Sequence, residues 1–91
     1  ERTGWLVRGT PLAFRLEQTA DIGSATARID ELRGLDVPAY LRAVDFSDGG
    51  TAYRVYAGAY ADKREASYLL THLKTQGLDN ATLSPRRGRL P

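Results

Sequence analysis

The sequence predicts an α+β fold in which four antiparallel strands form one sheet and two helices pack on one of its faces. A strand followed by a helix occurs twice, and the second copy maps onto the first when 41 is subtracted from its residue numbers. Residues 37–44 form a third alternating segment between the copies, and a short last strand is expected at residues 81–84. The order β-α-β-β-α-β, with right-handed crossovers, places the first and third strands at the centre of the sheet.

The second strand–helix unit has the clearer signals. Residues 51–58 alternate between two faces, as a strand does. Asp62 can cap a helix because its carboxylate accepts free backbone N–H groups, and Glu65 can bond back in a capping box. Apolar residues then recur at helical spacing. Gly77 can take the left-handed conformation that closes a helix.

The first unit repeats this frame more weakly. Its strand is expected at residues 12–18 and its helix at residues 22–34, with Asp21 as the N-cap. Gly34 corresponds to Gly77 if the first unit is two residues shorter. Two copies are too few for a solenoid, so they indicate one pseudo-symmetric domain.

The alternation assigns each strand residue to one of two faces. The predicted core lies between the sheet and the helices: Leu12, Phe14, Leu16, Ile29, Leu32, Leu41, Val55, Leu69, Leu70 and Leu73. The opposite face carries no helix and is called the helix-free face. This face is expected to be exposed to solvent, or to be covered by a ligand or another chain. Its predicted residues are Ala13, Arg15, Glu17, Tyr40, Arg42, Ala52, Arg54 and Tyr56.

Bulk properties describe a small globular domain. The chain has 91 residues, a net charge of +2 and no cysteine, which excludes disulfides and thiolate metal sites. Residues 1–11 are expected to be a linker or an extra edge strand, with Trp5 packed on the domain, and residues 12–84 the domain itself. Residues 85–91 form a basic tail, expected to be solvated. Membrane attachment is expected only through an anchor outside this sequence.

Catalysis has little support in the residues. His72 is the only histidine and falls on the second helix, without a nucleophile or a metal-ligand pattern near it. The glycines at 49 and 50 belong to a turn that introduces no helix, so they are not a phosphate loop. We expect no enzyme activity, no metal and no cofactor.

The helix-free face is the candidate binding site. It offers three arginines and two tyrosines on adjacent strands. Tyrosine rings can stack on sugars or bases, and arginine donates paired hydrogen bonds to carboxylates, amides or phosphates. An ordinary solvated sheet face has the same composition, so the pattern alone leaves both interpretations open.

Residues 49–78 resemble the SPOR domain, the sporulation-related repeat of bacterial cell-envelope proteins. The resemblance consists of turn glycines before an aromatic–Arg–Val strand, and then Gly58, Tyr60, Ala66, Leu70, Leu73 and Gly77. It extends over residues 12–84 in weaker form. It implies the ferredoxin-like, or RNP-like, fold already predicted.

The resemblance also implies a function. SPOR domains are non-catalytic modules that bind septal glycan strands stripped of stem peptides, through the helix-free face, in the cell envelope or periplasm. The family's first strand commonly reads Val-Gln-x-Gly-Ser-Phe. Here Arg15 stands at the glutamine, Glu17 at the glycine and Gln18 at the serine, and Glu17 is expected to pair with Arg15 or Arg54. The implied ligand-binding residues are Arg54, Tyr56, Arg15, Glu17, Gln18, Tyr40 and Arg42.

Two alternatives remain beside peptidoglycan glycan strands as the partner. A SPOR-like domain could dock an envelope protein by edge addition, or bind another envelope polymer. RNA recognition ranks below both, because the first-strand position that should be aromatic is Arg15 and the net charge is small. Nucleic acid is therefore not an expected partner.

Overall fold

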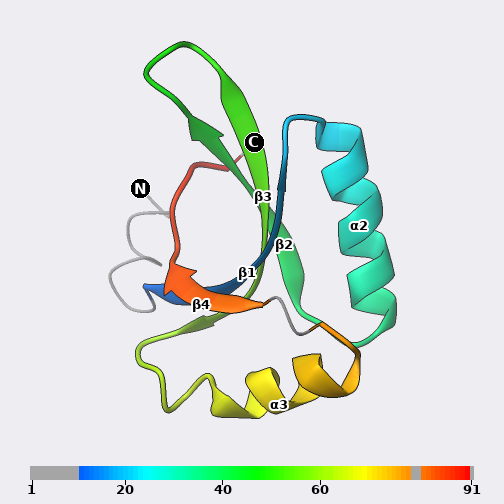
Figure 1. Cartoon of the computed structure of the whole chain (residues 1–91). Coiled ribbons are helices and arrows are strands. Elements are labelled where there is room, and N and C mark those ends of the chain that lie inside the picture. Colours follow the sequence, from blue (N-terminus) through cyan, green and yellow to red (C-terminus); the bar gives the residue numbers. More distant parts are fainter. Residues whose placement is uncertain (1–10, 79–80, 91) are drawn as a thin grey trace.

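The computed structural model describes residues 11–78 and 81–90. In chain order the elements are β1 (Leu12–Thr19), α2 (Ile22–Gly34), β2 (Ala39–Asp45), β3 (Thr51–Tyr60), α3 (Ser67–Thr75) and β4 (Thr82–Pro85) (Figure 1). The strands form one antiparallel sheet in the order β2-β3-β1-β4, so the predicted fold class and central strands are confirmed. The expected linker or edge strand, with Trp5, falls almost wholly outside the described residues.

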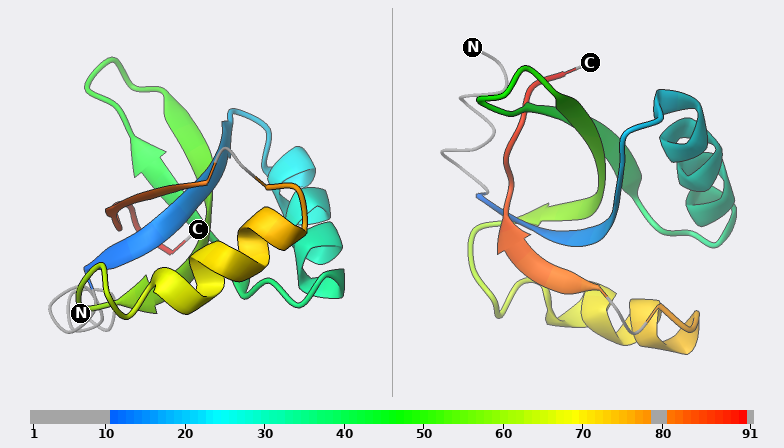
Figure 2. Two further views of the ribbon diagram at one scale, coloured as in Figure 1. Left: turned by 60° about the horizontal axis from the view of Figure 1, so that its bottom comes forward. Right: turned by 45° about the horizontal axis from the view of Figure 1, so that its top comes forward.

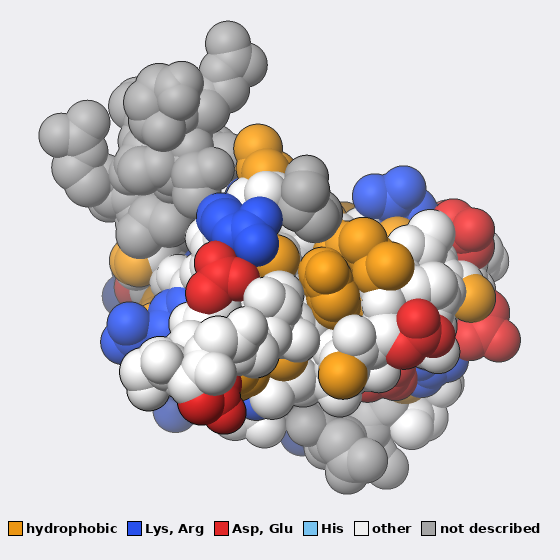
Figure 3. Space-filling model, turned by 90° about the horizontal axis from the view of Figure 1, so that it is seen from above, with side chains coloured by type: hydrophobic (Ala, Val, Ile, Leu, Met, Phe, Trp, Pro, Cys, Tyr) orange, Lys and Arg blue, Asp and Glu red, His pale blue; other side chains and the backbone are white. Residues whose placement is uncertain are grey.

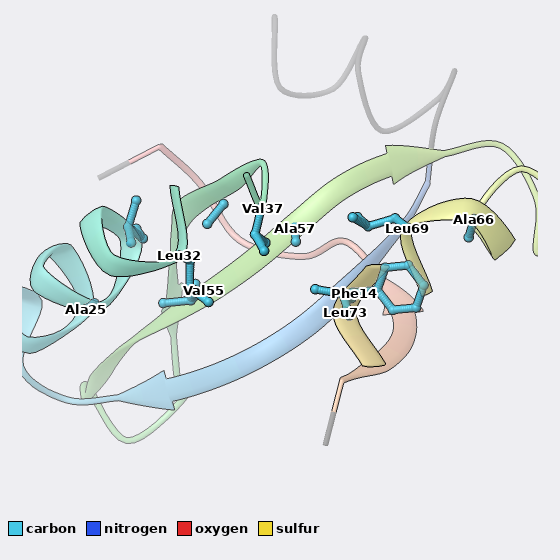
Figure 4. Close-up of a cluster of buried hydrophobic side chains, with 11 residues drawn as sticks. Phe14, Ala25, Leu32, Val37, Val55, Ala57, Ala66, Leu69 and Leu73 are labelled. Atoms are coloured by element: carbon cyan, nitrogen blue, oxygen red, sulfur yellow. The ribbon is translucent and has the colours of Figure 1, made fainter. Parts of the chain in front are cut away.

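Both helices contribute to one hydrophobic core on the same face of the sheet (Figures 2 and 4). Among the predicted core residues, Leu16, Leu41 and Leu70 are only partly buried, and Leu12 is not part of this cluster. The prediction missed several small residues, because alanine gives a weak hydrophobic signal. The buried members of the cluster are Phe14, Ala25, Ile29, Leu32, Val37, Ala39, Val55, Ala57, Ala66, Leu69 and Leu73.

The predicted cap starts α2, whereas the predicted capping box at Asp62 and Glu65 forms in the turns that precede α3. Asp21 accepts the backbone N–H of Ser24 at 3.1 Å and its hydroxyl at 2.7 Å, and these bonds lower the pKa of Asp21, the hydroxyl most. Asp62 accepts the N–H of Glu65 at 3.0 Å, and the Glu65 carboxylate accepts the N–H of Ala61 at 3.1 Å. The regular helix α3 nevertheless begins only at Ser67, because tighter i to i+3 turns occupy the residues before it.

Both helices end in the same Schellman arrangement. Gly77, with φ +77°, closes α3, and the N–H of Leu78 donates to the Leu73 carbonyl at 2.9 Å. The equivalent left-handed residue after α2 is Asp36, with φ +61°, and not Gly34. The expected two-residue shortening is therefore wrong. The 41-residue offset holds through the helix end, because buried Leu32 and Val37 fix the position of the turn.

Replacing Asp36 with glycine should stabilise the domain. A non-glycine residue is held in the left-handed region there, so Asp36→Gly should raise the free energy of unfolding by about 0.5–1 kcal/mol in urea titrations. Asp30→Gly is the matched control. Asp30 lies inside α2, where glycine should lower stability instead. A loss of stability in Asp36→Gly would contradict this account of the helix end.

The two central strands each carry a β-bulge. On β3 the bulge lies around Gly58, whose φ is +74°, between the pairs Phe14–Ala57 and Leu12–Tyr60. On β1 the extra residue is Leu16, between the pairs Arg15–Tyr56 and Glu17–Val55. The bulges fall at neighbouring points of the repeat, since Gly58 corresponds to Glu17 and the extra residue on β1 is the adjacent Leu16, but the one on β1 needs no glycine. A bulge shifts the alternation of the strand, and this shift decides where the site residues point.

Candidate functional site

The helix-free face brings most of the predicted site residues together. Tyr40 on β2 lies opposite Tyr56 on β3, with ring centroids 6.0 Å apart. Arg42 is the cross-strand neighbour of Arg54, and its guanidinium lies 5.2 Å from the centre of the Tyr40 ring. The central part of the face is thus a layer of stacked tyrosine and arginine side chains.

Gln18 joins the two central strands. Its side-chain carbonyl accepts a hydrogen bond from Arg15 at 2.6 Å and one from Arg54 at 2.8 Å. Arg54 also donates to the Tyr56 hydroxyl at 3.3 Å. Each guanidinium has five N–H donors, so these bonds orient the two arginines and leave each with further donors. We call Arg15, Gln18 and Arg54 the arginine–glutamine cluster.

A hollow of about 310 Å³ adjoins this cluster. Its lining residues on β1 are Arg15, Leu16, Glu17 and Gln18, and those on β4 are Thr82 and Ser84. Arg15 and Arg54 are half-buried, whereas Gln18 is exposed. The accessible end of the helix-free face therefore lies beside this hollow.

Glu17 does not lie where the sequence indicated. The bulge at Leu16 turns Glu17 to the helix side of the sheet, opposite Val55. Its carboxylate lies 3.6 Å from the guanidinium of Arg28 on α2. The expected pairing of Glu17 with Arg15 or Arg54 is therefore wrong, and Gln18 takes that position between them.

The basic C-terminal tail lies across the helix-free face. Beyond β4, residues 86–90 run from the edge at β1 and β4 to the free edge of β2 (Figures 1 and 2). The N–H of Arg86 donates to the Pro11 carbonyl at 2.7 Å, and Arg89 and Ala43 exchange backbone hydrogen bonds of 2.9 Å. We call residues 86–90 the C-terminal strap. The expectation of a solvated tail is wrong for Arg86, which is buried, whereas residues 87–90 are exposed but attached to the sheet by backbone hydrogen bonds.

The strap encloses the tyrosine layer. The N–H of Arg87 donates to the Tyr56 hydroxyl at 3.2 Å, and the Arg86 guanidinium donates to the Tyr40 hydroxyl at 3.4 Å. Tyr56 is 0% exposed and Arg42 is 6% exposed, while Tyr40 is half-buried. Burial raises the pKa of Tyr40, against an opposing effect of the bond from Arg86. A base cannot stack on Tyr56 in this arrangement.

Arg89 fastens the end of the strap. Its guanidinium bonds both carboxylate oxygens of Asp45, at 2.7 and 3.1 Å. The Arg89 bond, with a further one from Thr51, lowers the pKa of Asp45 to about 2. The Asp45 carboxylate is therefore ionised at neutral pH, where it pairs with Arg89.

The histidine and the charged side chains elsewhere on the described residues have ordinary surroundings. His72 bonds the Leu35 carbonyl at 3.0 Å through Nε2, which links α3 to the end of α2. Positive and negative side chains are interspersed on the face in Figure 3. In residues 11–78 and 81–90 no cluster of three or more potential metal ligands occurs. None of the described helices is long and apolar enough to cross a membrane.

A second hollow, which the sequence did not indicate, lies on the helix side. It has a volume of about 890 Å³ between α3 and β4, and its apolar walls include Phe14, Leu70 and Leu83. It arises because α3 starts late and β4 is short, so neither covers this end of the sheet.

The architecture defines a ferredoxin-like domain with a polar and aromatic sheet face, the form of a binding module. The SPOR domain model matches residues 11–83, so the chain belongs to the SPOR domain family. This family is known generally as a peptidoglycan-binding module of bacterial envelope proteins and is generally non-catalytic. No curated protein and no solved structure matches the chain.

Proposed function

We propose that the domain binds glycan strands stripped of their stem peptides, and so brings the protein that carries it to the division septum in the periplasm. Membership of a peptidoglycan-binding family supports the polymer class. The arginine–glutamine cluster, beside an open hollow between β1 and β4, is the observation that supports this ligand. Any attachment to the membrane would come from another part of the parent protein.

The chemistry of the cluster suits a stripped glycan. Hydrolysis of the amide between the sugar's lactyl group and the stem peptide leaves a carboxylate on the glycan. Two guanidinium groups held by one amide carbonyl present N–H donors to such a carboxylate and to sugar hydroxyls. Removal of the peptide also clears space for the sugar ring to enter the hollow.

The proposed contacts divide into two groups. Arg15, Gln18 and Arg54 meet the ligand first, because they line or border the accessible end of the face. Tyr40, Arg42 and Tyr56 lie under the strap and form the deeper part of the face. Glu17 pairs with Arg28 on α2 and so lies outside the arginine–glutamine cluster, although it lines the same hollow.

Removal of the Arg54 side chain should weaken glycan binding. A hydrogen bond to a charged group contributes about 1.5–3 kcal/mol, so Arg54→Ala should raise the Kd for amidase-treated sacculi by about 10- to 100-fold. Arg28→Ala is the control: it removes the same charge from the helix side, where Arg28 pairs with Glu17 and Glu31. Thermal unfolding of both variants checks that the fold persists. Equal binding by Arg54→Ala and the parent would show that the arginine–glutamine cluster is not the glycan-binding site.

A further inference from the structure

The C-terminal strap packs tightly against the sheet. Gly88 has φ +106°, and a Cβ atom added to it would lie 2.6 Å from the Ala43 carbonyl oxygen and 3.1 Å from the Arg42 Cβ. The strap thus runs against the sheet at van der Waals distance. Only glycine allows the chain both this backbone conformation and this approach.

Polar anchors lie on both sides of Gly88. Arg86 is 6% exposed, an unusual degree of burial for a cation, and it bonds Tyr40. Arg89 forms the antiparallel bridge with Ala43 and the ion pair with Asp45. Together they hold the strap against the helix-free face, with a single β-bridge to the free edge of β2.

The strap covers the same side chains that a ligand would use. Arg86 and Arg87 occupy the hydroxyls of Tyr40 and Tyr56, and Gly88 lies on Arg42. A polymer lying along the whole helix-free face cannot reach these groups while the strap is in place. The strap also lies beyond residues 11–83, the part of the chain that matches the SPOR domain model.

We propose that the strap is an intramolecular ligand of the helix-free face, which a glycan strand must displace to bind along its full length. This inference rests on the proposed function. The arginine–glutamine cluster stays accessible at the end of the face, so a glycan can make first contact there. It then competes with the strap for Tyr40, Arg42 and Tyr56.

The ion pair that fastens the end of the strap is weak, so the strap can begin to release from that end. The Arg89–Asp45 pair is well exposed, with 58% and 53% of the two side chains accessible, and exposed pairs add little in water. The strap lies at the end of the domain and contributes no residue to the hydrophobic core. Its release therefore leaves the sheet and helices intact and opens the edge of β2.

Two variants, Gly88→Ala and Arg87→Ala, distinguish the effect of releasing the strap on glycan affinity from the effect of losing a positive charge. Gly88→Ala keeps every arginine but blocks the close approach at Ala43. Arg87→Ala removes a positive charge, yet it leaves the strap in place because only the backbone N–H of Arg87 bonds Tyr56. For the parent and both variants, the affinity for soluble glycan chains prepared with an amidase is measured by calorimetry. Hydrogen exchange of the Ala43 amide, which bonds Arg89, is followed alongside.

We expect Gly88→Ala to bind the glycan about 5- to 100-fold more tightly than the parent, the usual range of coupling between competing ligands. Its Ala43 amide should exchange faster, and in the parent that amide should lose protection when glycan is added. Arg87→Ala should bind no more tightly than the parent. If the parent binds glycan and Gly88→Ala binds equally or more weakly, the strap is not a competitor and the proposed function stands. If no form binds glycan, the proposed function fails, and this inference fails with it.

Discussion

Phe14→Ala should lower the free energy of unfolding by about 3–5 kcal/mol, the range for truncating a buried aromatic residue. Phe14 is 2% exposed on the central strand β1 and lies among residues from both helices. Its ring also meets the edge of Tyr60, with centroids 6.1 Å apart and planes at 71°. The truncation therefore removes contacts from the sheet, from α3 and from the bulged end of β3 at once.

Urea denaturation of Phe14→Ala and of Phe46→Ala provides the measurement. Phe46 is 44% exposed at the β2–β3 turn, where its backbone rather than its ring makes the turn hydrogen bonds. Truncation of Phe46 should therefore cost less than about 1 kcal/mol, as for a surface change. Similar losses in the two variants would show that the core is not centred where the sheet and α3 meet.

Gly58→Ala should have the next largest effect, a loss of about 2–4 kcal/mol from the left-handed backbone and from overpacking. Gly58 has φ +74°, and an added Cβ would lie 2.5 Å from the Tyr60 ring. Its carbonyl also accepts the Tyr40 hydroxyl at 2.8 Å, so the bulge helps to hold a residue of the candidate site. The ring of Tyr60 can move only at the expense of its packing on Phe14.

Gly34→Ala is the control for Gly58→Ala. Gly34 lies in the last turn of α2 with nothing near an added Cβ, so alanine should be neutral or stabilising by about 0.5–1 kcal/mol. Thermal and urea unfolding of the two variants should thus shift in opposite directions. If Gly58→Ala were as well tolerated as Gly34→Ala, the bulge on β3 would not need a positive φ.

Local signals predicted most of the fold. The expected bounds of the first helix, residues 22–34, agree with α2, because Asp21 caps it and its apolar spacing is regular. The side chains of β2 and β3 also point to the expected faces. The pairing of these two strands is regular from Ala39–Ala57 to Asp45–Thr51, with no bulge to shift Tyr40, Arg42 or Arg54. Alternation and caps act within a few residues, so they can be read from the chain itself.

The features that escaped prediction depend on distant contacts. Glu17 points to the helix side of the sheet, and not to the predicted helix-free face, because β1 has one extra residue relative to β3. That bulge depends on how the two strands pair, and no local pattern in β1 reveals it. The strap was expected to be solvated because its sequence is charged. Its position depends on the free edge of β2, on Asp45 and on the one glycine that can pass Ala43.

Recognition of stripped glycan is the property on which the proposed function depends. Co-sedimentation of the purified domain with sacculi tests it, with untreated sacculi compared against sacculi whose stem peptides an amidase has removed. We expect retention to rise on the stripped material, and to fall there when Arg54 is replaced with alanine. Equal retention on both materials, or none on either, would contradict the account and would leave the arginine–glutamine cluster without this ligand.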